Sequence, residues 1–340
     1  MRAAVIGASG YTGAELVRLI VGHPELALAG VYARRRAGEH IAAVLPSLAG
    51  VVDQTIEAFD ADAVAAACDV AFAALPHGAS AAVVGALVDR DVAVVDLSAD
   101  FRHRDVATYE TWYGTHPRPE LIERAVLGLP ELSRQREALV GARLIACPGC
   151  YVTASVLALA PLLAAGVIEP ERIIIDAKSG ASGAGREPGA GTHLPEVGEG
   201  IRAYKVAGTH RHTPEIEALL GHGARVTFTP HLVPISRGIL AVAYATPTRR
   251  EPSVHMATLA SAYRGEPFVT AVERLPDTSW VRGSNRAQVT ARYDERTDTV
   301  IAMAAIDNLV KGAAGQAVQS CNLAMGWSET AGLGAAPLFP

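Results

Sequence analysis

The sequence contains few cysteines, few aromatic residues and no excess of basic residues. Its 4 cysteines among 340 residues stand at irregular positions, 68, 147, 150 and 321. This number and spacing exclude a disulfide scaffold and favour a reducing compartment. The formal net charge of −5 argues against a general nucleic-acid-binding protein, although it allows a local basic pocket for a phosphate group.

Hydrophobic residues make up 50% of the chain, whereas aromatic residues make up 5%. Alanine and valine predominate, as suits parallel strands packed between helices in one or two domains. Residues 151–168 contain no charged residue, which allows a membrane-spanning interpretation. Pro161, with Thr153 and Ser155, makes a buried helix the better interpretation. The chain starts in a predicted strand without a signal-peptide pattern, so we expect a cytoplasmic protein without membrane contacts.

A glycine-rich turn near the start predicts a dinucleotide site. It lies between a predicted strand at 2–6 and a predicted helix at 14–21, and its spacing is G-x-x-G-x-x-G. Such a turn lets backbone N–H groups approach a pyrophosphate at a helix N-terminus; the alternative is a tight turn without a ligand. The predicted cofactor ligands are Gly7, Ser9, Gly10, Tyr11, Thr12 and Gly13.

Arginines follow the second predicted strand, residues 26–32. Arg34, Arg35 and Arg36 come directly after it, and no acidic residue occurs before Glu39. An NAD-selective site usually offers an acidic residue here to the ribose 2′-hydroxyl, whereas arginine suits a 2′-phosphate. We therefore predict NADP(H), bound by Arg34 and Arg35; the alternative is a solvated basic loop.

Two further loops follow predicted strands at 70–74 and 92–95. The first is Leu75-Pro76-His77-Gly78, and the second covers residues 96–102. Ligands of open α/β sheets lie at the carboxyl ends of the strands, so both loops are candidates for contact with cofactor or substrate. Arg102 is a candidate ligand for a substrate phosphate or carboxylate; the alternative is a salt bridge to Asp96 or Asp100.

Cys150 is the candidate nucleophile. A predicted strand at 142–146 leads into a sharp turn at Pro148 and Gly149, and a predicted helix at 151–163 follows. A thiol at a helix start faces unpaired N–H groups and the positive end of the helix dipole, which favours the nucleophilic thiolate. The alternative is a buried structural cysteine. The C-x-x-C spacing with Cys147 also allows a thiol–disulfide oxidoreductase or a regulatory disulfide.

The second half of the chain has a different pattern. A strand at 172–177 runs into a Gly/Ser-rich loop at 178–186, a candidate site for a phosphate or a nicotinamide, or else a mobile surface loop. Predicted strands at 225–233, 238–245 and 268–273, with a hairpin of 287–293 and 299–305, indicate a second, α+β domain. In the last predicted helix, 308–324, Gly312 and Gly315 suggest close packing against another backbone or a cofactor.

A thiolate together with NADP(H) points to chemistry at an acyl carbonyl. Cys150 would form a thioester, which hydride reduces to a thiohemiacetal that collapses to an aldehyde. Histidine suits the proton transfer, and we choose His212 over His210 because Glu215 lies close enough in sequence to orient it.

An acyl phosphate offers a good leaving group, and Arg102, Arg211 and the 179–186 loop could bind its phosphate. The N–H groups at the start of the Cys150 helix could stabilise the oxyanion.

The chain resembles the N-acetyl-gamma-glutamyl-phosphate reductases of arginine biosynthesis. The resemblance extends from about residue 2 to residue 325 and rests on seven motifs that occur in one order. The motifs are the turn at 7–13, Leu75-Pro76-His77-Gly78, residues 96–102, Pro148-Gly149-Cys150-Tyr151, residues 179–186, His210-Arg211-His212-Thr213-Pro214-Glu215, and Asn308-Leu309-Val310-Lys311-Gly312 with Gly315-Gln316. The family often has asparagine where this chain has Cys147, which puts in doubt any role of an amide beside the nucleophile.

The resemblance implies an α/β fold with an N-terminal Rossmann NADP-binding domain at 1–148, completed by 308–330. An α+β domain like that of glyceraldehyde-3-phosphate dehydrogenases would cover 149–307, with the last helix returning to the first domain. It also implies NADPH, no metal, a homodimer or homotetramer, and reduction of N-acetyl-glutamyl 5-phosphate to N-acetyl-glutamate 5-semialdehyde and phosphate. Within these motifs, the further predicted cofactor ligands are Leu75, Pro76, Ser98, Ser179, Gly180, Ser182, Gly183 and Asn308. The predicted substrate ligands are Arg102, Tyr151, Arg211, Glu215, Ser182 and Gly183.

Three other functions stay open at this point. Reductases of a carrier-protein-bound aminoadipyl phosphate in lysine biosynthesis share nearly all these motifs, but they need a basic surface for an acidic carrier. Aspartate-semialdehyde dehydrogenase matches the 210–215 segment less well. A redox-sensing NADP-binding regulator without catalysis is disfavoured by the presence of Cys150 with both histidines.

Overall fold

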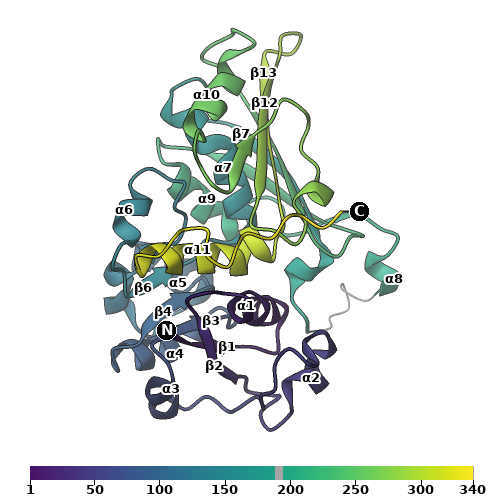
Figure 1. The fold of residues 1–340 in the computed structure, drawn as a ribbon. Helices are drawn as coiled ribbons and strands as arrows, with labels where there is room; N and C mark the ends of the chain where they lie inside the picture. Colours follow the sequence, from purple (N-terminus) through teal and green to yellow (C-terminus); the bar gives the residue numbers. More distant parts are fainter. Residues whose placement is uncertain (188–193, 340) are drawn as a thin grey trace. The chain divides into compact units, whose positions relative to one another are not determined.

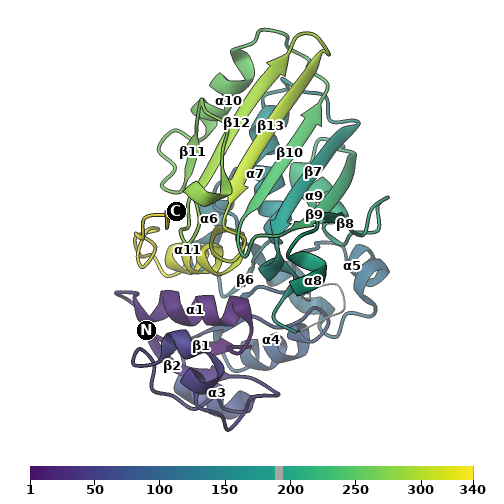
Figure 2. The same cartoon turned by 90° about the vertical axis from the view of Figure 1, so that its right-hand side faces the viewer.

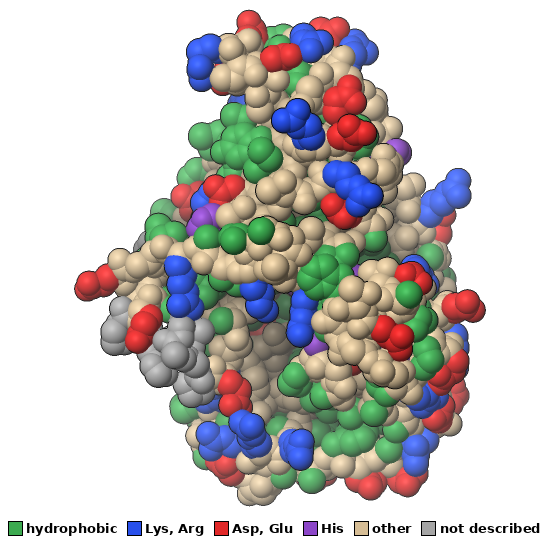
Figure 3. All heavy atoms as spheres, turned by 180° about the vertical axis from the view of Figure 1, so that it is seen from behind, with side chains coloured by type: hydrophobic (Ala, Val, Ile, Leu, Met, Phe, Trp, Pro, Cys, Tyr) green, Lys and Arg blue, Asp and Glu red, His purple; other side chains and the backbone are tan. Residues whose placement is uncertain are grey.

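A computed structural model describes residues 1–187 and 194–339 of the chain (Figure 1). The chain forms two compact units, Met1–Pro148 with Ala313–Gly334, and Gly149–Gly312 with Ala335–Pro340. Among the described residues, no helix has the length and apolar character needed to cross a membrane. Acidic and basic side chains are interspersed on the face shown in Figure 3, as expected from 30 basic and 35 acidic residues.

The first unit is built on a parallel six-stranded sheet with the order β2-β1-β3-β4-β6-β5. Its strands are β1 (Arg2–Ile6), β2 (Ala27–Tyr32), β3 (Val70–Ala73), β4 (Ala93–Asp96), β5 (Val126–Leu127) and β6 (Leu144–Ala146). The chain leaves β1 toward β2 on one side and returns to β3 on the other, so the strand order reverses between β1 and β3. Dinucleotides bind at such a switch point, outside the carboxyl ends of the strands.

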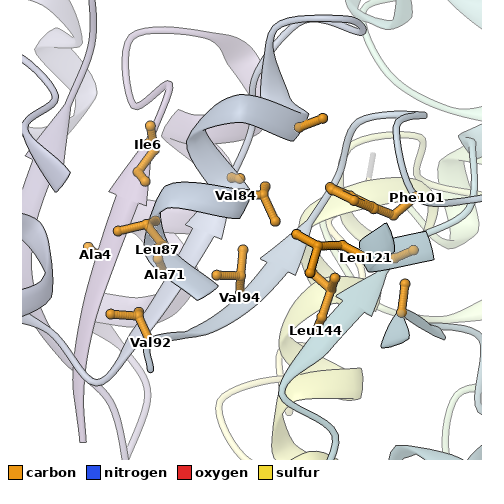
Figure 4. Packing of buried hydrophobic residues seen from close by; sticks show 14 of the residues in the cluster. Ala4, Ile6, Ala71, Val84, Leu87, Val92, Val94, Phe101, Leu121 and Leu144 are labelled. Atoms are coloured by element: carbon orange, nitrogen blue, oxygen red, sulfur yellow. The ribbon is translucent and has the colours of Figure 1, made fainter. Parts of the chain in front are cut away.

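Helices complete the first unit, and an apolar core lies between them and the sheet. They are α1 (Tyr11–Val21), α2 (Ile41–Val44), α3 (Ala61–Ala67), α4 (Ser80–Val88), α5 (Val106–Tyr113), α6 (Gln135–Leu139) and α11 (Gly315–Ala324). Figure 4 shows Val84 and Leu87 of α4 among strand residues such as Ala71 and Val94, all fully buried. The last helix, α11, packs on α1 and α6 of this unit, as the resemblance implies.

The second unit is built on a mixed seven-stranded sheet with the order β11-β12-β13-β10-β7-β9-β8. Its strands are β7 (Ile173–Gly180), β8 (Arg202–Ala203), β9 (Val226–Val233), β10 (Ile239–Ala245), β11 (Val269–Ala271), β12 (Ala287–Asp294) and β13 (Thr299–Ile306). β7 pairs parallel with β9 and β11 with β12, while the other neighbours are antiparallel. The predicted fold class, an α/β domain followed by an α+β domain, is therefore confirmed.

Helices α7 (Cys150–Ala164), α9 (His212–Leu220) and α10 (Val254–Ala262) pack on this sheet, and α8 (Leu194–Val197) is a short additional turn. Figure 2 shows α7 behind the strands, with the other face of the sheet toward the viewer. Cross-strand neighbours on that face are apolar: Tyr244 pairs with Ile174 and with Ile301. Ile174 is 47% and Tyr244 37% exposed, so two exposed apolar side chains lie side by side on this face.

α7 is the uncharged run that allowed a membrane interpretation. Most of its side chains are buried, so the prediction of a buried helix is confirmed. Pro161 lies inside the helix and has no N–H to donate to the carbonyl four residues earlier. That carbonyl, of Leu157, instead accepts a hydrogen bond from the Tyr263 hydroxyl at 2.7 Å. The tyrosine thus compensates the defect that the proline introduces.

The predicted elements match the observed ones within a few residues, with two differences. The predicted helix at 308–324 begins as a π-helix, Val310–Ala314, and only then continues as α11. β7 extends through Gly180, so Ser179 and Gly180 belong to a strand, where the sequence predicted the start of a loop. Strand pairing with β10 and β9 explains this, because Ser179 pairs with Ile239 and with Leu232.

Candidate active site

The turn after β1 leaves no space for side chains at two of its glycines. Gly7 has φ +89°, and a methyl group there would overlap the carbonyl of Ala74, next to the end of β3. A methyl group on Gly13 would stand 2.7 Å from the Cα of Ala8 and would overlap the Gly7 carbonyl. Such a cradle fits a pyrophosphate, which requires backbone to approach it closely.

Helix α1 begins directly behind this cradle. Gly10 is its N-cap, and the helix start has neither a side-chain cap nor an acidic residue in its first turn. The N-terminal N–H groups and the positive end of the helix dipole therefore suit an anion. Of the arginines beyond β2, Arg36 pairs with Glu39 at 3.1 Å, whereas Arg34 and Arg35 are exposed on the same loop. The cofactor ligands predicted here stay predictions that this geometry fits.

The Leu75–Gly78 loop is held by Asp100, a role that the sequence did not suggest. The buried Asp100 carboxylate accepts hydrogen bonds from the N–H groups of Gly78 at 2.8 Å and Ala81 at 2.9 Å, and from the Tyr109 hydroxyl at 3.1 Å. It therefore ties the loop to the start of α4. Leu75 is half-buried and Pro76 exposed, as a contact with cofactor would require.

Ser98 is a predicted cofactor ligand that lies inside the unit. It is fully buried, and its hydroxyl donates to Asp96 at 2.7 Å and accepts from the N–H of Asp100 at 3.0 Å. Burial raises the pKa of Asp96 to about 6, while hydrogen bonds from Ser80 and Ser98 oppose that shift. The Ser98 side chain thus supports the loop, and its contact with a cofactor stays a prediction.

Arg102 braces the turn that leads to the nucleophile. Its Nε donates to the carbonyl oxygen of Cys147 at 2.6 Å, and its Nη2 donates to that of Leu97 at 2.8 Å. The guanidinium thus links the two loop segments that directly follow β4 and β6. This is a structural role that neither of the two sequence interpretations anticipated. Binding of a substrate phosphate by Arg102 stays a prediction.

Cys150 is the first residue of α7, and Gly149 is its N-cap. No acidic residue stands in the first turn, so the helix dipole favours a thiolate there. Cys150 is partly exposed, whereas Cys147 is buried, and neither is part of a disulfide. Burial raises the pKa of the Cys147 thiol well above its usual range. Cys147 is therefore a poor partner for a regulatory disulfide, which needs an accessible thiolate.

His212 lies against the turn that carries Cys150. It begins α9, and a methyl group on Gly149 would overlap its imidazole. The side chain can reach this position only because residue 149 is a glycine. The predicted pairing of Cys150 with His212 is therefore supported by direct packing of the histidine on the N-cap of α7.

His210 has a different environment, which separates the two histidines. Its Nδ1 accepts a hydrogen bond from the backbone N–H of His212 at 3.0 Å, so it supports the start of α9. Burial, with a smaller effect from the positive charges of Lys205 and Arg211, lowers the pKa of His210 to about 4. His210 is therefore neutral near pH 7 and already engaged through Nδ1.

Glu215 and Tyr151 make contacts that the sequence did not indicate. The buried Glu215 carboxylate accepts a hydrogen bond from the Gly149 N–H at 2.9 Å, so it fixes the turn that carries Cys150.

Tyr151 is 3% exposed. Its hydroxyl donates a hydrogen bond to the His231 carbonyl at 3.0 Å and accepts one from the Tyr204 hydroxyl at 3.2 Å. The exposed Arg211 lies between the two histidines. Substrate binding by Tyr151, Arg211 and Glu215 stays a prediction.

The Gly/Ser-rich segment after β7 is linked to Asn308. The Asn308 amide donates to the Ser182 hydroxyl at 2.9 Å and accepts from the Gly238 N–H at 2.7 Å. A methyl group on Gly183 would stand 2.8 Å from the Ser179 hydroxyl. The structure thus brings together the cofactor ligands predicted in the second unit, Ser179, Gly180, Ser182, Gly183 and Asn308.

Comparison with known proteins gives this geometry its context. Residues 2–140 match the semialdehyde dehydrogenase NAD-binding domain, and residues 150–308 match the semialdehyde dehydrogenase dimerisation domain. An aspartate semialdehyde dehydrogenase from Candida albicans, solved with NADP, has a similar fold with a TM-score of 0.72 at 18% identity. That similarity covers 95% of this chain and 98% of the other.

Sequence comparison finds relatives that match this chain over its full length. The N-acetyl-gamma-glutamyl-phosphate reductase of Symbiobacterium thermophilum is 49% identical over 100% of this chain and 99% of its own length. That of Citrifermentans bemidjiense is 48% identical over 100% of both chains. The resemblance found in the seven motifs is thereby confirmed. The chain belongs to the N-acetyl-gamma-glutamyl-phosphate reductase family.

Proposed function

We propose that this protein reduces N-acetyl-L-glutamyl 5-phosphate with NADPH to N-acetyl-L-glutamate 5-semialdehyde and phosphate, a step of arginine biosynthesis. The observation that carries the proposal is a cysteine at the N-terminus of α7 beside a histidine packed on its N-cap. Full-length identity of 49% to a reductase of this name supports the choice of substrate.

Cys150 attacks the acyl carbonyl as a thiolate. The S–C bond forms, the bond from the carbonyl carbon to the phosphate oxygen breaks, and phosphate leaves with the electron pair. The first intrahelical hydrogen bond of α7 runs from Thr153 N–H to the Gly149 carbonyl at 2.8 Å. The earlier N–H groups of Tyr151 and Val152 therefore have no acceptor within the helix and can donate to the developing oxyanion.

His212 handles the proton. Reduction of the thioester leaves negative charge on the former carbonyl oxygen, which needs a proton when the thiohemiacetal forms and gives it up when the aldehyde is released. The imidazole packed on Gly149 stands one residue from the nucleophile. His210 acts through His212 as a positioning residue, because its Nδ1 holds the His212 backbone.

The first unit, 1–148 completed by the C-terminal helix, binds NADPH, and residues 149–307 bind the substrate. Bound NADPH supplies the hydride for reduction of the thioester. The glycine cradle and the start of α1 hold the pyrophosphate, and Arg34 and Arg35 hold the 2′-phosphate. Leu75, Pro76 and Ser98, with the segment around Ser182 and Asn308, position the rest of the cofactor. Arg102, Arg211 and the 179–186 segment bind the substrate phosphate.

The protein acts as a homodimer or homotetramer in the cytoplasm. The apolar row of Ile174, Tyr244 and Ile301 on the outer face of the second sheet supplies the surface between copies. The match of residues 150–308 to a dimerisation domain supports an oligomer of this kind. Burial of exposed apolar area is the usual driving force for such contacts.

The reverse reaction tests this proposal and avoids the unstable acyl phosphate. Protein is mixed with N-acetyl-glutamate semialdehyde, phosphate and NADP, and NADPH absorbance is followed, with NAD in parallel. Phosphate-dependent NADPH formation is expected, with little signal from NAD. A signal only with a carrier-linked aminoadipate semialdehyde would move the assignment to lysine biosynthesis. Absence of NADPH formation with both substrates would contradict an enzymatic function.

A further inference from the structure

The π-helix that precedes α11 contacts the candidate nucleophile. Within the second unit, the N–H of Gly312 donates to the carbonyl of Asp307, five residues earlier, at 2.9 Å. This is the π-type bond of the Val310–Ala314 helix. π-helical turns are rare and occur frequently at functional sites. Here the π-helix lies against Cys150.

No side chain fits at Gly312. A methyl group there would stand 2.8 Å from the Cβ of Cys150, 3.3 Å from its Cα and 3.3 Å from the Cδ1 of Ile306. Carbon atoms that are not bonded need about 3.5–4.0 Å. Gly312 is not among the glycines with positive φ. The requirement for glycine is therefore one of space beside the cysteine and not one of backbone conformation.

The segment that carries Gly312 is anchored and resists displacement. The carboxylate of Asp307, fully buried, accepts hydrogen bonds from the N–H groups of Leu309 at 2.8 Å and Gly283 at 2.7 Å. The next residue, Asn308, is held through Gly238. A group added at Gly312 would accordingly push on the start of α7 more readily than on its own backbone.

We propose that Gly312 is a positioning residue that sets the place of the Cys150 thiol at the start of α7. The inference rests on the proposed role of Cys150 as nucleophile. It adds that the backbone of the π-helix forms a wall against the Cβ of Cys150. That wall limits the directions in which the thiol can turn, and so directs it toward the reacting carbonyl.

The test is Gly312→Ala, with Gly22→Ala as the matched control. A methyl group on Gly22 would meet only ordinary contacts at 3.9–4.0 Å. Misplacement of a reacting group by about 1 Å can cost roughly 100-fold in rate. In the reverse reaction we expect Gly312→Ala to lower kcat by roughly 10- to 100-fold with KM for NADP within about twofold. Gly22→Ala should match the wild type.

A stability cycle keeps the inference testable if Gly312→Ala folds poorly. The substitution should lower Tm in the wild-type background and lower it much less in a Cys150→Gly background, which removes the Cβ it meets. Equal losses of Tm in both backgrounds, or a Gly312→Ala enzyme with wild-type kcat, would overturn the inference. The cycle does not depend on activity, so failure of the proposed function is seen separately, as absent turnover by the wild type.

Discussion

The chain uses the strand–turn–helix arrangement twice for chemistry, and the two turns are built differently. In the β1–α1 turn, the glycines pack closely against backbone: Gly7 lies against the Ala74 carbonyl and Gly13 against Gly7 itself. In the β6–α7 turn, Gly149 packs closely against a side chain, the imidazole of His212. His212 belongs to a helix far along the sequence. In the proposed function, the backbone of the first turn binds a ligand. The second turn places His212 beside the proposed nucleophile.

The largest effect that this comparison predicts is at Cys150. Cys150→Ala removes the nucleophile, so turnover should fall on the order of 10⁴-fold or more. Binding of NADPH, measured by fluorescence titration, should stay within about twofold, because the β1–α1 turn is intact. Equal loss of turnover and of NADPH binding would show that Cys150 is structural.

The next largest effect should distinguish His212 from His210 by the loss of kcat that each substitution causes. His212→Asn should lower kcat roughly 10²- to 10⁴-fold, as removal of a general acid–base does. His210→Asn should retain much more activity, because an amide oxygen can replace Nδ1 as acceptor for the His212 N–H. The measurement is kcat for both variants at pH 7. A greater loss at His210 than at His212 would reverse the assignment.

Substitution of one glycine in each turn tests directly whether the two turns have separate roles. Overpacking costs about 1–3 kcal/mol, so Gly13→Ala should weaken NADPH binding roughly 10- to 100-fold. Gly149→Ala should displace His212 and lower kcat by a similar factor, with unchanged NADPH affinity. Titration of NADPH and steady-state kinetics on both variants give the result. If both variants lost cofactor binding alike, the two turns would not have separate roles.

The parts of this site that the sequence predicted depend on residues close together in the chain. Gly7 to Gly13 and the position of Cys150 at a helix start follow from strand, turn and helix patterns within a few residues. The contacts of Gly149 with Glu215 and of Gly312 with Cys150 join positions 66 and 162 residues apart. They result from packing in three dimensions, for which a single sequence carries no local signal.

A smaller, pH-dependent effect is expected from His210. Its pKa in the folded protein, about 4, lies below the usual value near 6.5, so the unfolded chain binds more protons between these values. Stability should therefore fall as pH decreases from about 6.5 to about 4, by roughly 3 kcal/mol at most. Urea unfolding across this range should show a shallower decrease for His210→Asn. An identical decrease would mean that another group titrates.

The smallest effect concerns the helix behind the nucleophile and not the turn itself. Tyr263→Phe leaves the buried Leu157 carbonyl without the hydroxyl that compensates Pro161. We expect a loss of about 1–3 kcal/mol in the free energy of unfolding, with kcat unchanged. Urea unfolding and kinetics on the same preparation separate the two quantities. A change in kcat without a change in stability would contradict a purely structural role.

Trapping the acyl-enzyme tests the central claim, a covalent thioester on Cys150. Protein is incubated with N-acetyl-glutamate semialdehyde and NADP in the absence of phosphate, where oxidation can proceed to the thioester but release is blocked. Mass spectrometry of the intact protein should show an N-acetylglutamyl adduct that maps to the peptide containing Cys150 and disappears when phosphate is added. NADPH formation without any adduct, or an adduct on another residue, would contradict the account.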